Sequence, residues 1–504
     1  MKAFKIFSMA AVAFMMVACS SEDTALDNTP VAGQKVHFTA TIAAPNSDAS
    51  TRTTYTEITS GTDAGKIKVA WEQGDEIALI HNGTKDVVTV QTLNADGSAN
   101  ISGDITVGTD GEAVTILYPA ATVNAPASGA VPVEDATYAT KWNSQDGTLT
   151  YIQDYLDYCK ATSTLKVSGT KATLNDNISM ESTIAIFMFT IQDLGGTDKT
   201  ATEFKVSDAS GNVIATVTPG SATGTLYVAL PVMAAGTYWF NATVGGNPYI
   251  AKATVATATT AGNYYQTTVK LATVGNIIGA DGKFYANKTA VDAAATTGAA
   301  MIVYLGSDGE TNATYNHGLA IALTDASTYA KAKWGTYNAD AGLTKYTHWC
   351  QGDDDASTDM TGIANTAALK TLYNGNTDYE AANAVSGYSV AGFTPGDHGF
   401  SDWFLPSAGQ WYKFLNGMCG LAWTGGWGWA TGTGSDNFNT VNAKFTAAGY
   451  DTDDAKFENV DWYWSSSEYS LGNAVDVNFD SDYGVLVGHN GKVGQNRVRC
   501  FLAF

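Results

Sequence analysis

Residue types that carry catalysis are present in this sequence, but their spacing forms no catalytic motif. The chain contains no G-x-S-x-G, no H-E-x-x-H, no P-loop, and no dinucleotide-binding glycine pattern between a strand and a helix. Its six histidines are scattered, without the spacing that metal ligands need. We therefore expect no catalytic residue and no metal ligand, and we predict that the protein is not an enzyme.

Five cysteines are present, and the first of them, Cys19, follows an apolar leader. The other four are Cys159, Cys350, Cys419 and Cys500. An even number of cysteines in an exported chain permits disulfides, and four cysteines allow three pairings. The sequence leaves the pairing open, and it predicts that Cys419 and Cys500 are either bonded or buried.

Two runs of aspartate, Asp353–Asp355 and Asp451–Asp454, could bring several carboxylates together. Hard oxygen ligands from a single loop suit Ca²⁺, so a calcium site is one interpretation of these runs. Consecutive aspartates in a polar loop are more often simply hydrated, and we expect no cofactor. Two carboxylates for glycoside hydrolysis would also need a shared cleft.

A tryptophan- and glycine-rich stretch, residues 423–429, is the strongest candidate for ligand binding. Exposed tryptophan rings bind the apolar faces of sugars and form hot spots in protein interfaces. The alternative is that these rings fill the core of a loop-rich fold. A hairpin over residues 478–490 combines polar and aromatic side chains and is a second candidate surface. The predicted ligand-binding residues are Trp423, Trp427, Trp429, Asp482, Tyr483 and His489.

The N-terminus has the pattern of an export signal. Two lysines precede an apolar run, residues 6–17, which is too short to span a bilayer and has the length of a signal peptide. The following Met16-Val17-Ala18-Cys19 resembles the lipobox of bacterial lipoproteins, which implies acylation of Cys19. An ordinary secretory signal is the alternative. Residues 1–19 are thus predicted to be the signal peptide and lipobox, and residues 20–34 a tether.

Composition narrows the classes of partner. The chain has 49 acidic and 27 basic residues, a formal net charge of −22, and only 15% charged residues overall. Nucleic acids and anionic lipids demand a basic face, so neither is an expected ligand. At 504 residues the chain should contain about three domains. The acidic Ser20-Ser21-Glu22-Asp23 after Cys19 resembles surface-export signals of Bacteroidota lipoproteins, which implies an outer-membrane lipoprotein at the cell surface.

Period-two alternation of apolar residues predicts a β-rich fold over the first half of the chain. Residues 35–160 are predicted to form one β-sandwich and residues 161–272 a second. From residue 273 the pattern changes, since most tryptophans and the candidate helices Thr289–Thr297 and Ser407–Leu415 follow it. We predict a separate α+β domain over 273–504. The strands predicted for the first sandwich are Lys35–Ile42, Ile67–Trp71, Glu76–Ile80, Val87–Val90 and Val114–Pro119; those for the second are Ile184–Ile191, Thr225–Pro231 and Thr237–Val244.

The stretches Thr51–Tyr55 and Ile67–Ile77, with the core W-x-x-G-D-x-I, resemble the N-terminal part of fimbrillin-like proteins. Those lipoproteins build pili in Bacteroidota, and the resemblance implies two sandwich domains of transthyretin-like topology. It also implies cleavage by an Arg-specific protease near the first strand, for which Arg52 is the candidate. Loss of that strand would open a groove for the C-terminal strand of another pilus subunit.

A second resemblance covers the last hundred residues. Ser401–Ser407, Tyr463–Tyr469 and Arg497–Cys500 are similar to C-type-lectin-like domains of the group that also resembles formylglycine-generating enzymes. The resemblance implies a lectin-like fold whose final strand, near Val498–Phe501, returns to the core. Such a chain could accept a donor strand but not give one, which predicts a position at a pilus tip. The calcium-binding motifs of classical lectins are missing, so calcium-mediated sugar binding is not expected.

Two functions remain open at this stage. The first is an adhesin, a tip or accessory subunit of a fimbria assembled by strand exchange, that binds a host or microbial glycan or protein. The second is a monomeric surface lipoprotein that binds glycan outside any filament.

Overall fold

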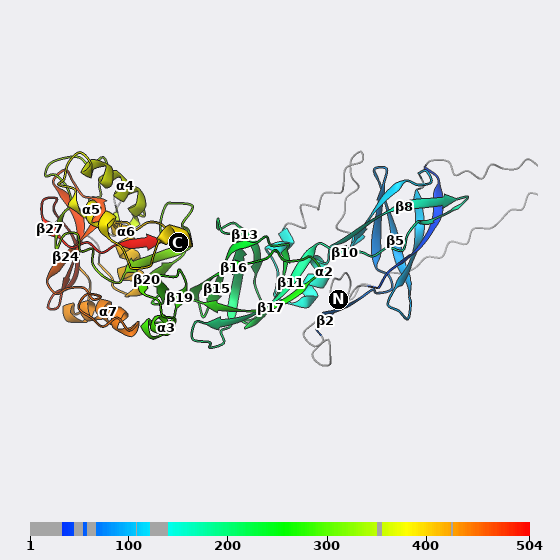
Figure 1. Ribbon diagram of the computed structural model, residues 1–504, viewed down its shortest axis with the longest axis horizontal. Coiled ribbons are helices and arrows are strands. Elements are labelled where there is room, and N and C mark those ends of the chain that lie inside the picture. Colours follow the sequence, from blue (N-terminus) through cyan, green and yellow to red (C-terminus); the bar gives the residue numbers. More distant parts are fainter. Residues whose placement is uncertain are drawn as a thin grey trace, which may run out of the picture.

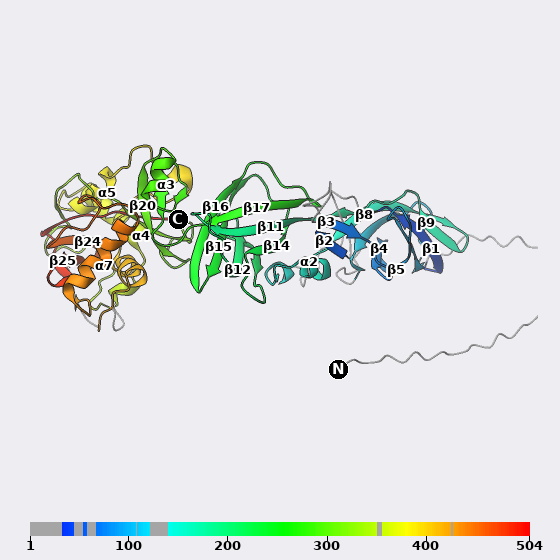
Figure 2. The same ribbon diagram turned by 90° about the horizontal axis from the view of Figure 1, so that it is seen from below.

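A computed structural model describes residues 33–44, 54–57, 67–106, 108–120, 140–349, 355–424 and 427–504. The molecule is elongated, and three folded units follow one another along its long axis (Figures 1 and 2). Strands dominate the first two units, and helices join them in the third. The prediction of a mostly β chain is confirmed. None of the helices in the described ranges has both the length and the apolarity to cross a membrane.

The first unit is a single eight-stranded sheet that closes on itself. Its strand order is β10-β8-β7-β4-β5-β6-β1-β9, and β8 also pairs with β9. Because β8 pairs with β9, the sheet closes around one apolar core, to which β1 contributes Val36, Phe38 and Ile42. The bounds are β1 Lys35–Ile42, β4 Glu76–His81, β5 Thr84–Leu93, β6 Ala99–Thr106, β7 Ala113–Tyr118, β8 Cys159–Ser168, β9 Lys171–Leu174 and β10 Glu181–Ser182.

The first sheet extends past the domain boundary predicted at residue 160, which falls inside β8. Leu165, Leu174 and Ile178 all belong to the core of the first unit. Alternation of apolar residues marks a strand but does not say which sheet it joins, and β8, β9 and β10 join the first.

Two pieces of the N-terminal half reach across to the second unit. The hairpin of β2 (Thr54–Glu57) and β3 (Ile67–Ala70) carries Glu57, which accepts hydrogen bonds from Tyr227 Oη and, at 3.3 Å, from Tyr264 Oη. The segment that leads into α2 (Leu149–Tyr155) places Gln145 against the backbone of Ala229, with an Oε1 to N distance of 2.9 Å. These hydrogen bonds connect the first two units. A cluster of buried apolar residues, with members from both units, connects them as well.

The second unit consists of two facing sheets, with strand orders β14-β11-β17 and β13-β12-β15-β16. Phe189 of one sheet packs against Phe204 and Phe240 of the other, with ring centroids 5.2 and 5.6 Å apart. The near-continuous apolar run at 184–191 is the central strand β11, as expected for a strand covered on both sides. The bounds are β11 Ile184–Asp193, β12 Ala201–Ser207, β13 Val213–Val217, β14 Thr225–Pro231, β15 Gly236–Val244, β16 Asn247–Val255 and β17 Tyr264–Leu271.

The third unit, residues 273–504, is called the head. It contains a five-stranded sheet ordered β19-β18-β20-β21-β28, a four-stranded sheet ordered β23-β26-β25-β24, and the small pair β22-β27. Its strands are β18 Ile277–Gly279, β19 Phe284–Tyr285, β20 Gly298–Leu305, β21 Gly318–Ala322, β22 Ala332–Lys333, β23 Gly428–Trp429, β24 Asp461–Glu468, β25 Asn473–Asp480, β26 Gly484–Gly491, β27 Gln495–Asn496 and β28 Phe501–Ala503. Its α-helices are α3 Lys288–Ala293, α4 Gly362–Tyr373, α5 Glu380–Gly387, α6 Ala408–Tyr412 and α7 Gly434–Ala447.

The candidate helices Thr289–Thr297 and Ser407–Leu415 overlap α3, which ends at Ala293, and α6, which ends at Tyr412. The latter continues as a π-helical turn over Lys413–Met418. Short 3-10 turns occupy Ala356–Thr358 and Pro395–His398. The four-stranded sheet lies at the end of the head that is remote from the second unit, in both views (Figures 1 and 2).

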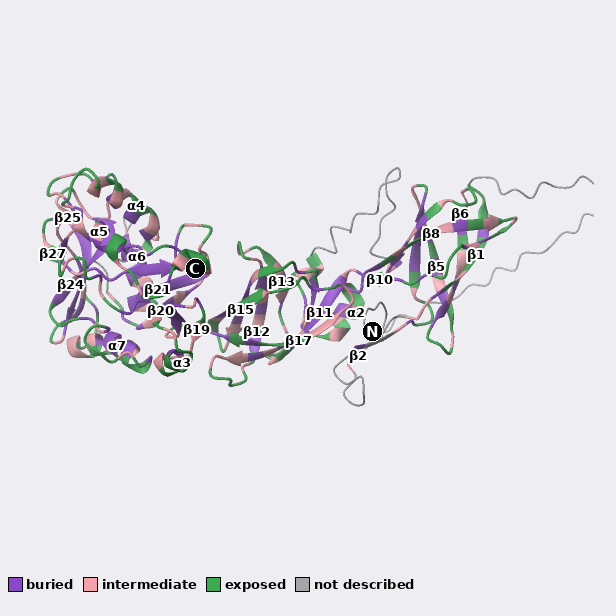
Figure 3. Cartoon of the chain, in the orientation of Figure 1, coloured by how far each residue is buried: buried purple, intermediate pink, exposed green. Residues whose placement is uncertain are grey.

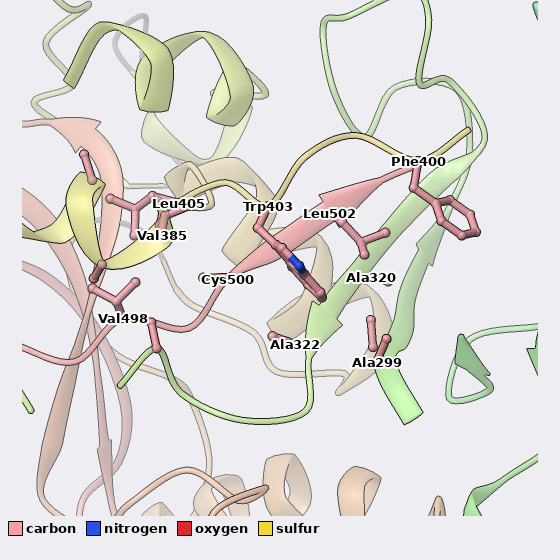
Figure 4. Close-up of a cluster of buried hydrophobic side chains, with 14 of the residues drawn as sticks. Ala299, Ala320, Ala322, Val385, Phe400, Trp403, Leu405, Val498, Cys500 and Leu502 are labelled. Atoms are coloured by element: carbon pink, nitrogen blue, oxygen red, sulfur yellow. The ribbon is translucent and has the colours of Figure 1, made fainter. Parts of the chain in front are cut away.

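The C-terminal strand β28 is enclosed within the head. It pairs with β21 through Leu319↔Ala503 and Ile321↔Phe501, and Phe404 bridges Phe501 from its other side. The four last residues are all almost completely buried, as the burial colouring of this sheet also shows (Figure 3). Figure 4 shows Trp403, Leu502 and Ala320 gathered about this strand. The chain therefore ends inside a core.

The junction between the second unit and the head is aromatic. Trp239 of β15 stacks on His317 at a centroid distance of 4.2 Å and lies 6.1 Å from the ring of the terminal Phe504. Lys252 of β16 donates to the carbonyl oxygen of His398 in the head. The C-terminus thus serves both the head's core and its attachment to the neighbouring unit.

Candidate functional site

The motif residues of the head form scaffold contacts. Ser407 and Ser467 come from two different motifs, and both hydroxyls donate to Asp359, to its carbonyl oxygen and to its Oδ2 respectively, each at 2.5 Å. Trp464 donates through Nε1 to the carbonyl of Ala332 at 2.7 Å, and its own carbonyl accepts from Trp411 at 3.3 Å. These hydrogen bonds hold β24 and α6 together, so the motif residues that make them have a structural role.

The two C-terminal arginines also have structural partners. Arg499 is fully buried, and its Nε donates to Asp325 Oδ1 at 2.5 Å. Its guanidinium lies over the ring of Phe457, 4.9 Å from the centroid. Arg497 donates through Nε to Asp461 at 2.5 Å. Both side chains anchor the segment that leads into β28.

The head also contains a buried ion pair. Glu468 and Lys492 are both 0% exposed and form a salt bridge. Lys492 also donates to the carbonyl of Ala339 at 2.6 Å and lies over the ring of Trp334. A buried charge is tolerated only when its partner and hydrogen bonds are present, so this pair fixes the loops around it.

The aromatic residues predicted to bind ligand fall into three environments, and Trp423 lies in the first. Its ring packs edge-on against the fully buried Trp349 at 5.6 Å, and its Nε1 donates to the carbonyl of Gly428 at 3.1 Å. Trp423 is therefore a half-buried part of the fold, which is the alternative that the sequence left open for this ring.

Trp429 and Tyr483 form an exposed pair. Their ring centroids are 5.7 Å apart with an interplanar angle of 37°, and the two residues are 40% and 68% exposed. Trp429 lies on the edge strand β23, where it pairs with Leu486 of β26. Tyr483 lies in the turn between β25 and β26. The two residues are far apart in the sequence, and the sheet brings them together.

The turn that carries Tyr483 is rigidly built. Asp480 Oδ1 accepts from the backbone N–H groups of Asp482 and Tyr483, at 2.7 and 2.9 Å. Gly484 has a φ of +100°, and a Cβ there would meet the backbone of Gly434 at 2.9 Å. Only glycine fits this position, where the start of α7 supports the turn. Asp482 is exposed beside Tyr483, so a carboxylate accompanies the two rings.

Trp427 and His489 form a separate cluster with Tyr469. His489 stacks on Tyr469 at 3.8 Å, and Trp427 contacts both rings edge-on at 5.7 and 5.5 Å. Trp427 Nε1 donates to the carbonyl of Thr347, and Asn473 Nδ2 lies 3.2 Å from His489 Nδ1. Burial lowers the pKa of His489, so its ring is neutral near pH 7. This cluster is half-buried and offers ring edges and one imidazole to the surface.

Tyr469 was missing from the predicted site. It lies at the end of the motif Tyr463–Tyr469, which was used only for its resemblance to lectin-like domains. The stack on His489 depends on the register of β24 against β25 and β26, and a single sequence does not specify register. Trp429 was among the candidates because the glycine-rich stretch 423–429 carries it, but this pattern does not distinguish it from the half-buried Trp423 and Trp427.

The cysteines of the described ranges are buried. Burial raises the pKa of the Cys419 thiol to about 12 and shifts the pKa of Cys500 in the same direction, so neither is prepared to act as a thiolate. Of the cysteines in the described ranges, Cys419 and Cys500 are free thiols. The sequence predicted that both would be either bonded or buried, and the structure shows them buried. Cys159 Sγ lies 3.4 Å from Asp157 Oδ1.

The aspartate runs contribute local contacts. Asp451 pairs with Lys456 and accepts from Thr446 Oγ1 at 3.0 Å. Asp355 caps a 3-10 turn by accepting from Ser357 N at 2.8 Å. Within the part of the chain that the structure describes, no three acidic, histidine or cysteine side chains gather as a metal site. Cys19, Arg52, Cys350, Asp353 and Asp354 lie outside the described residues.

The candidate site is thus an exposed face rather than an enclosed catalytic centre. Trp429, Tyr483 and Asp482 offer two apolar ring faces and a hydrogen-bond acceptor. Such a surface suits a sugar ring, which has an apolar face and hydroxyl donors, or a protein side chain of the same character.

No family model matches the sequence, and no curated protein matches it. Among solved structures, a fimbrial protein from Bacteroides ovatus ATCC 8483 is 13% identical, aligned over 94% of this chain and 100% of its own, with a TM-score of 0.32. The shaft pilin SpaA from Lactobacillus rhamnosus GG is 10% identical over 48% of this chain and 99% of its own, with a TM-score of 0.21. A streptococcal ancillary pilin is 8% identical over 48% and 70%, with a TM-score of 0.17.

Proposed function

We propose that this protein is a cell-surface adhesin, a tip or accessory subunit of a fimbria, which binds a glycan or protein through its head. One observation carries the proposal: the exposed aromatic face belongs to the sheet at the remote end of the head, whereas the chain's own C-terminal strand is enclosed in that head. The molecule thus presents a recognition surface at one end, and its terminal strand is not available for donation to another subunit.

The enclosed β28 argues for a terminal position in a filament. Strand addition needs a donor strand with free backbone groups. β28 is hydrogen-bonded to β21, and Phe404 N donates to Phe501 O at 2.9 Å on the other side. Its release would expose Phe501, Leu502 and Phe504 and would dismantle the head. A subunit that accepts a strand without donating one ends a filament.

The first unit supplies the acceptor in this proposal. β1 pairs with β6 along its whole length, but with β9 only at His37 and Phe38, and a single bridge joins Ile42 to Ile178 beyond β9. Cleavage after Arg52 would separate β1 from the rest of the chain. Its departure would leave a groove between β6 and β9, into which a strand of another pilus subunit would fit.

An adhesion assay with the full-length chain tests the recognition role. A glycan array should identify the ligand class, and Trp429→Ala and Tyr483→Ala should each weaken binding to that ligand at least tenfold, because each removes one of two neighbouring rings. Tyr337→Ala is the matched control, since Tyr337 is a similarly exposed tyrosine of the head that lies outside the pair. Binding that survives both substitutions would reject the aromatic face as the ligand site.

The anchor is a further part of the proposal. An acylated Cys19 would hold the protein in the outer membrane at the cell surface, because each buried CH₂ of an acyl chain contributes about 0.8 kcal/mol. Cells fed labelled palmitate should incorporate the label into the protein, and Cys19→Ser should abolish it. An unlabelled membrane-bound protein would indicate another anchor.

The monomeric alternative is supported by one observation. All eight residues of β1 pair with β6, and its inward side chains complete the core, so the first unit is a finished fold without any partner strand. A monomeric lipoprotein that binds glycan would need nothing more. Resistance of the 45–53 segment to an Arg-specific protease, together with surface protein that never co-purifies with filaments, would favour this alternative.

A further inference from the structure

An acidic cluster, made of Asp86 and Glu112 on either side of His81, lies under the first residue of β1. Asp86 of β5 points inward and is only 5% exposed. Its Oδ2 accepts from Thr106 N at 2.7 Å and lies 3.1 Å from His81 Nε2. His81 is buried as well, and its Nδ1 is 3.6 Å from Glu112 Oε1. Two carboxylates therefore share one histidine at this end of the unit.

Lys35 supplies the missing positive charge. Its Nζ lies 2.7 Å from Asp86 Oδ1, while its side chain remains 59% exposed. Among the groups that the structure shows around Asp86, Lys35 is the one permanent cation, and it comes from β1. If β1 leaves, the cluster keeps its acidic groups and loses that cation.

We propose that this acidic cluster selects the strand that replaces β1, by requiring a lysine or arginine at its first position. This inference rests on the strand exchange proposed above and adds the chemistry of the partner. A basic residue restores the contact to Asp86, whereas an acidic residue would place a second carboxylate against the buried carboxylate of Asp86. Selection by repulsion of this kind is a common source of specificity.

The other residues of β1 define which side chains the replacing strand must carry at its remaining positions. Val36, Phe38 and Ile42 are buried, Ala40 is half-buried against the same core, and the intervening residues point outward. The fitting strand therefore carries a basic residue followed by apolar residues at its second, fourth and eighth positions, with a small residue at the sixth. Trp71 Nε1 donates to the carbonyl of Ala43 and marks the far end of the groove.

The chain's own C-terminal residues are already held in the head. Residues 497–504 do begin with a basic residue, Arg497, but this side chain donates to Asp461, and Phe501-Leu502-Ala503-Phe504 are all buried. Leu502 also stands at the sixth position, where the pattern asks for a small residue. We therefore expect the occupant of the groove to be a strand of a different polypeptide.

Strand replacement in the full-length chain tests this inference. The chain is nicked between β1 and β2, after Arg52 or at a protease site engineered over residues 46–51, so that β1 is held without a covalent link. Fluorescent peptides with the sequence of residues 33–44 then compete with the resident strand. We expect the Lys35→Glu peptide to be incorporated at least tenfold less than the native peptide, and the Lys35→Arg peptide about equally.

Thr39→Glu in the same peptide is the matched control, because it adds the same carboxylate on the outward face of the strand and should change incorporation less than threefold. In the Asp86→Asn protein the Lys35→Glu penalty should fall below threefold. Lack of incorporation of every peptide, the native one included, would overturn strand exchange and the selection with it. Incorporation that is indifferent to Lys35→Glu would overturn the selection alone and leave exchange standing.

Discussion

At the scale of single residues, the head depends on charges that are hidden from water. Glu468 and Lys492 are both fully enclosed, and Arg499 is enclosed beside Asp325. Some of these residues could be singled out in advance, since the motifs around Ser467 and Arg499 implied a lectin-like core. The pairing of Glu468 with Lys492 could not be predicted, because a contact between residues 24 positions apart follows from the register of β24, β25 and β26.

Removing one partner of this buried pair should be costly. Lys492→Met removes the buried cation from Glu468 and leaves its carboxylate only the longer contact to Lys345, so we expect a loss of about 3 kcal/mol in the free energy of unfolding. Lys345→Met is the control, because Lys345 is partly exposed and lies 3.5 Å from the same carboxylate, so its loss should cost less than about 1 kcal/mol. Urea denaturation of both variants measures this difference. Adding Glu468→Gln to Lys492→Met should recover part of the stability, and a further loss would contradict the assignment.

His317 should make the junction sensitive to acid. Burial, with the nearby Lys252, lowers its pKa to about 4 from an ordinary value of 6.5. Between these values the unfolded chain binds a proton that the folded chain does not, so stability falls as the pH decreases through this window. His317→Phe keeps a ring against Trp239 and removes the titration. Between pH 7 and pH 5 the wild type should lose about 2 kcal/mol more than the variant, as measured by urea unfolding. Equal losses would show that His317 is protonated in the folded state.

At the scale of secondary structure, local pattern and sheet pairing differ in how well they can be predicted. The strand expected at 35–42 is β1 with the same bounds, because alternation of apolar residues is a property of the strand itself. The partners of β1 could not be predicted, since β6 and β9 lie far along the chain. For the same reason the pattern of β8 is compatible with a strand in either unit, and only the sheet shows that it belongs to the first.

Within β1, the inward side chains should carry the stability of the first unit. Phe38 is fully buried, so Phe38→Ala should destabilise this unit by about 3–4 kcal/mol through lost burial and the cavity left behind. Thr39→Ala, one residue further and outward, should change it by less than about 0.5 kcal/mol. Hydrogen exchange of β4 to β6 amides measures both effects within the first unit. Similar protection in the two variants would mean that β1 does not hold the core together.

At the scale of the whole molecule, the sequence pattern predicted a change of fold along the chain, but it did not predict how the units connect. A change of pattern near residue 273 predicted a different C-terminal fold, and the head does combine helices with two sheets. Nothing in the sequence indicated that Phe504 would lie beside Trp239 of the second unit, or that the hairpin carrying Glu57 would contact Tyr227. Such contacts join residues far apart in the chain and depend on how completed units meet.

The position of the C-terminus predicts how the chain tolerates change there. Deleting residues 501–504 removes a strand of the five-stranded sheet and the ring that faces Trp239, so the head should unfold or become sensitive to protease. Deleting the same number of residues from the N-terminal side of β1, residues 31–34, should leave the head's protease resistance unchanged. Limited proteolysis followed by mass spectrometry compares the two. An intact head without its last four residues would show that β28 is dispensable and free to be donated.

The proposed arrangement, with a recognition face at one end and an acceptor groove at the other, is tested most directly on native filaments. Antibodies against residues 273–504, visualised with gold in the electron microscope, locate the head on the surface structures of intact cells. We expect gold at filament tips or at sparse accessory points, with the chain unable to polymerise alone. Regular labelling along the length of each filament would mean that the chain donates a strand after all, and would contradict a terminal or accessory position.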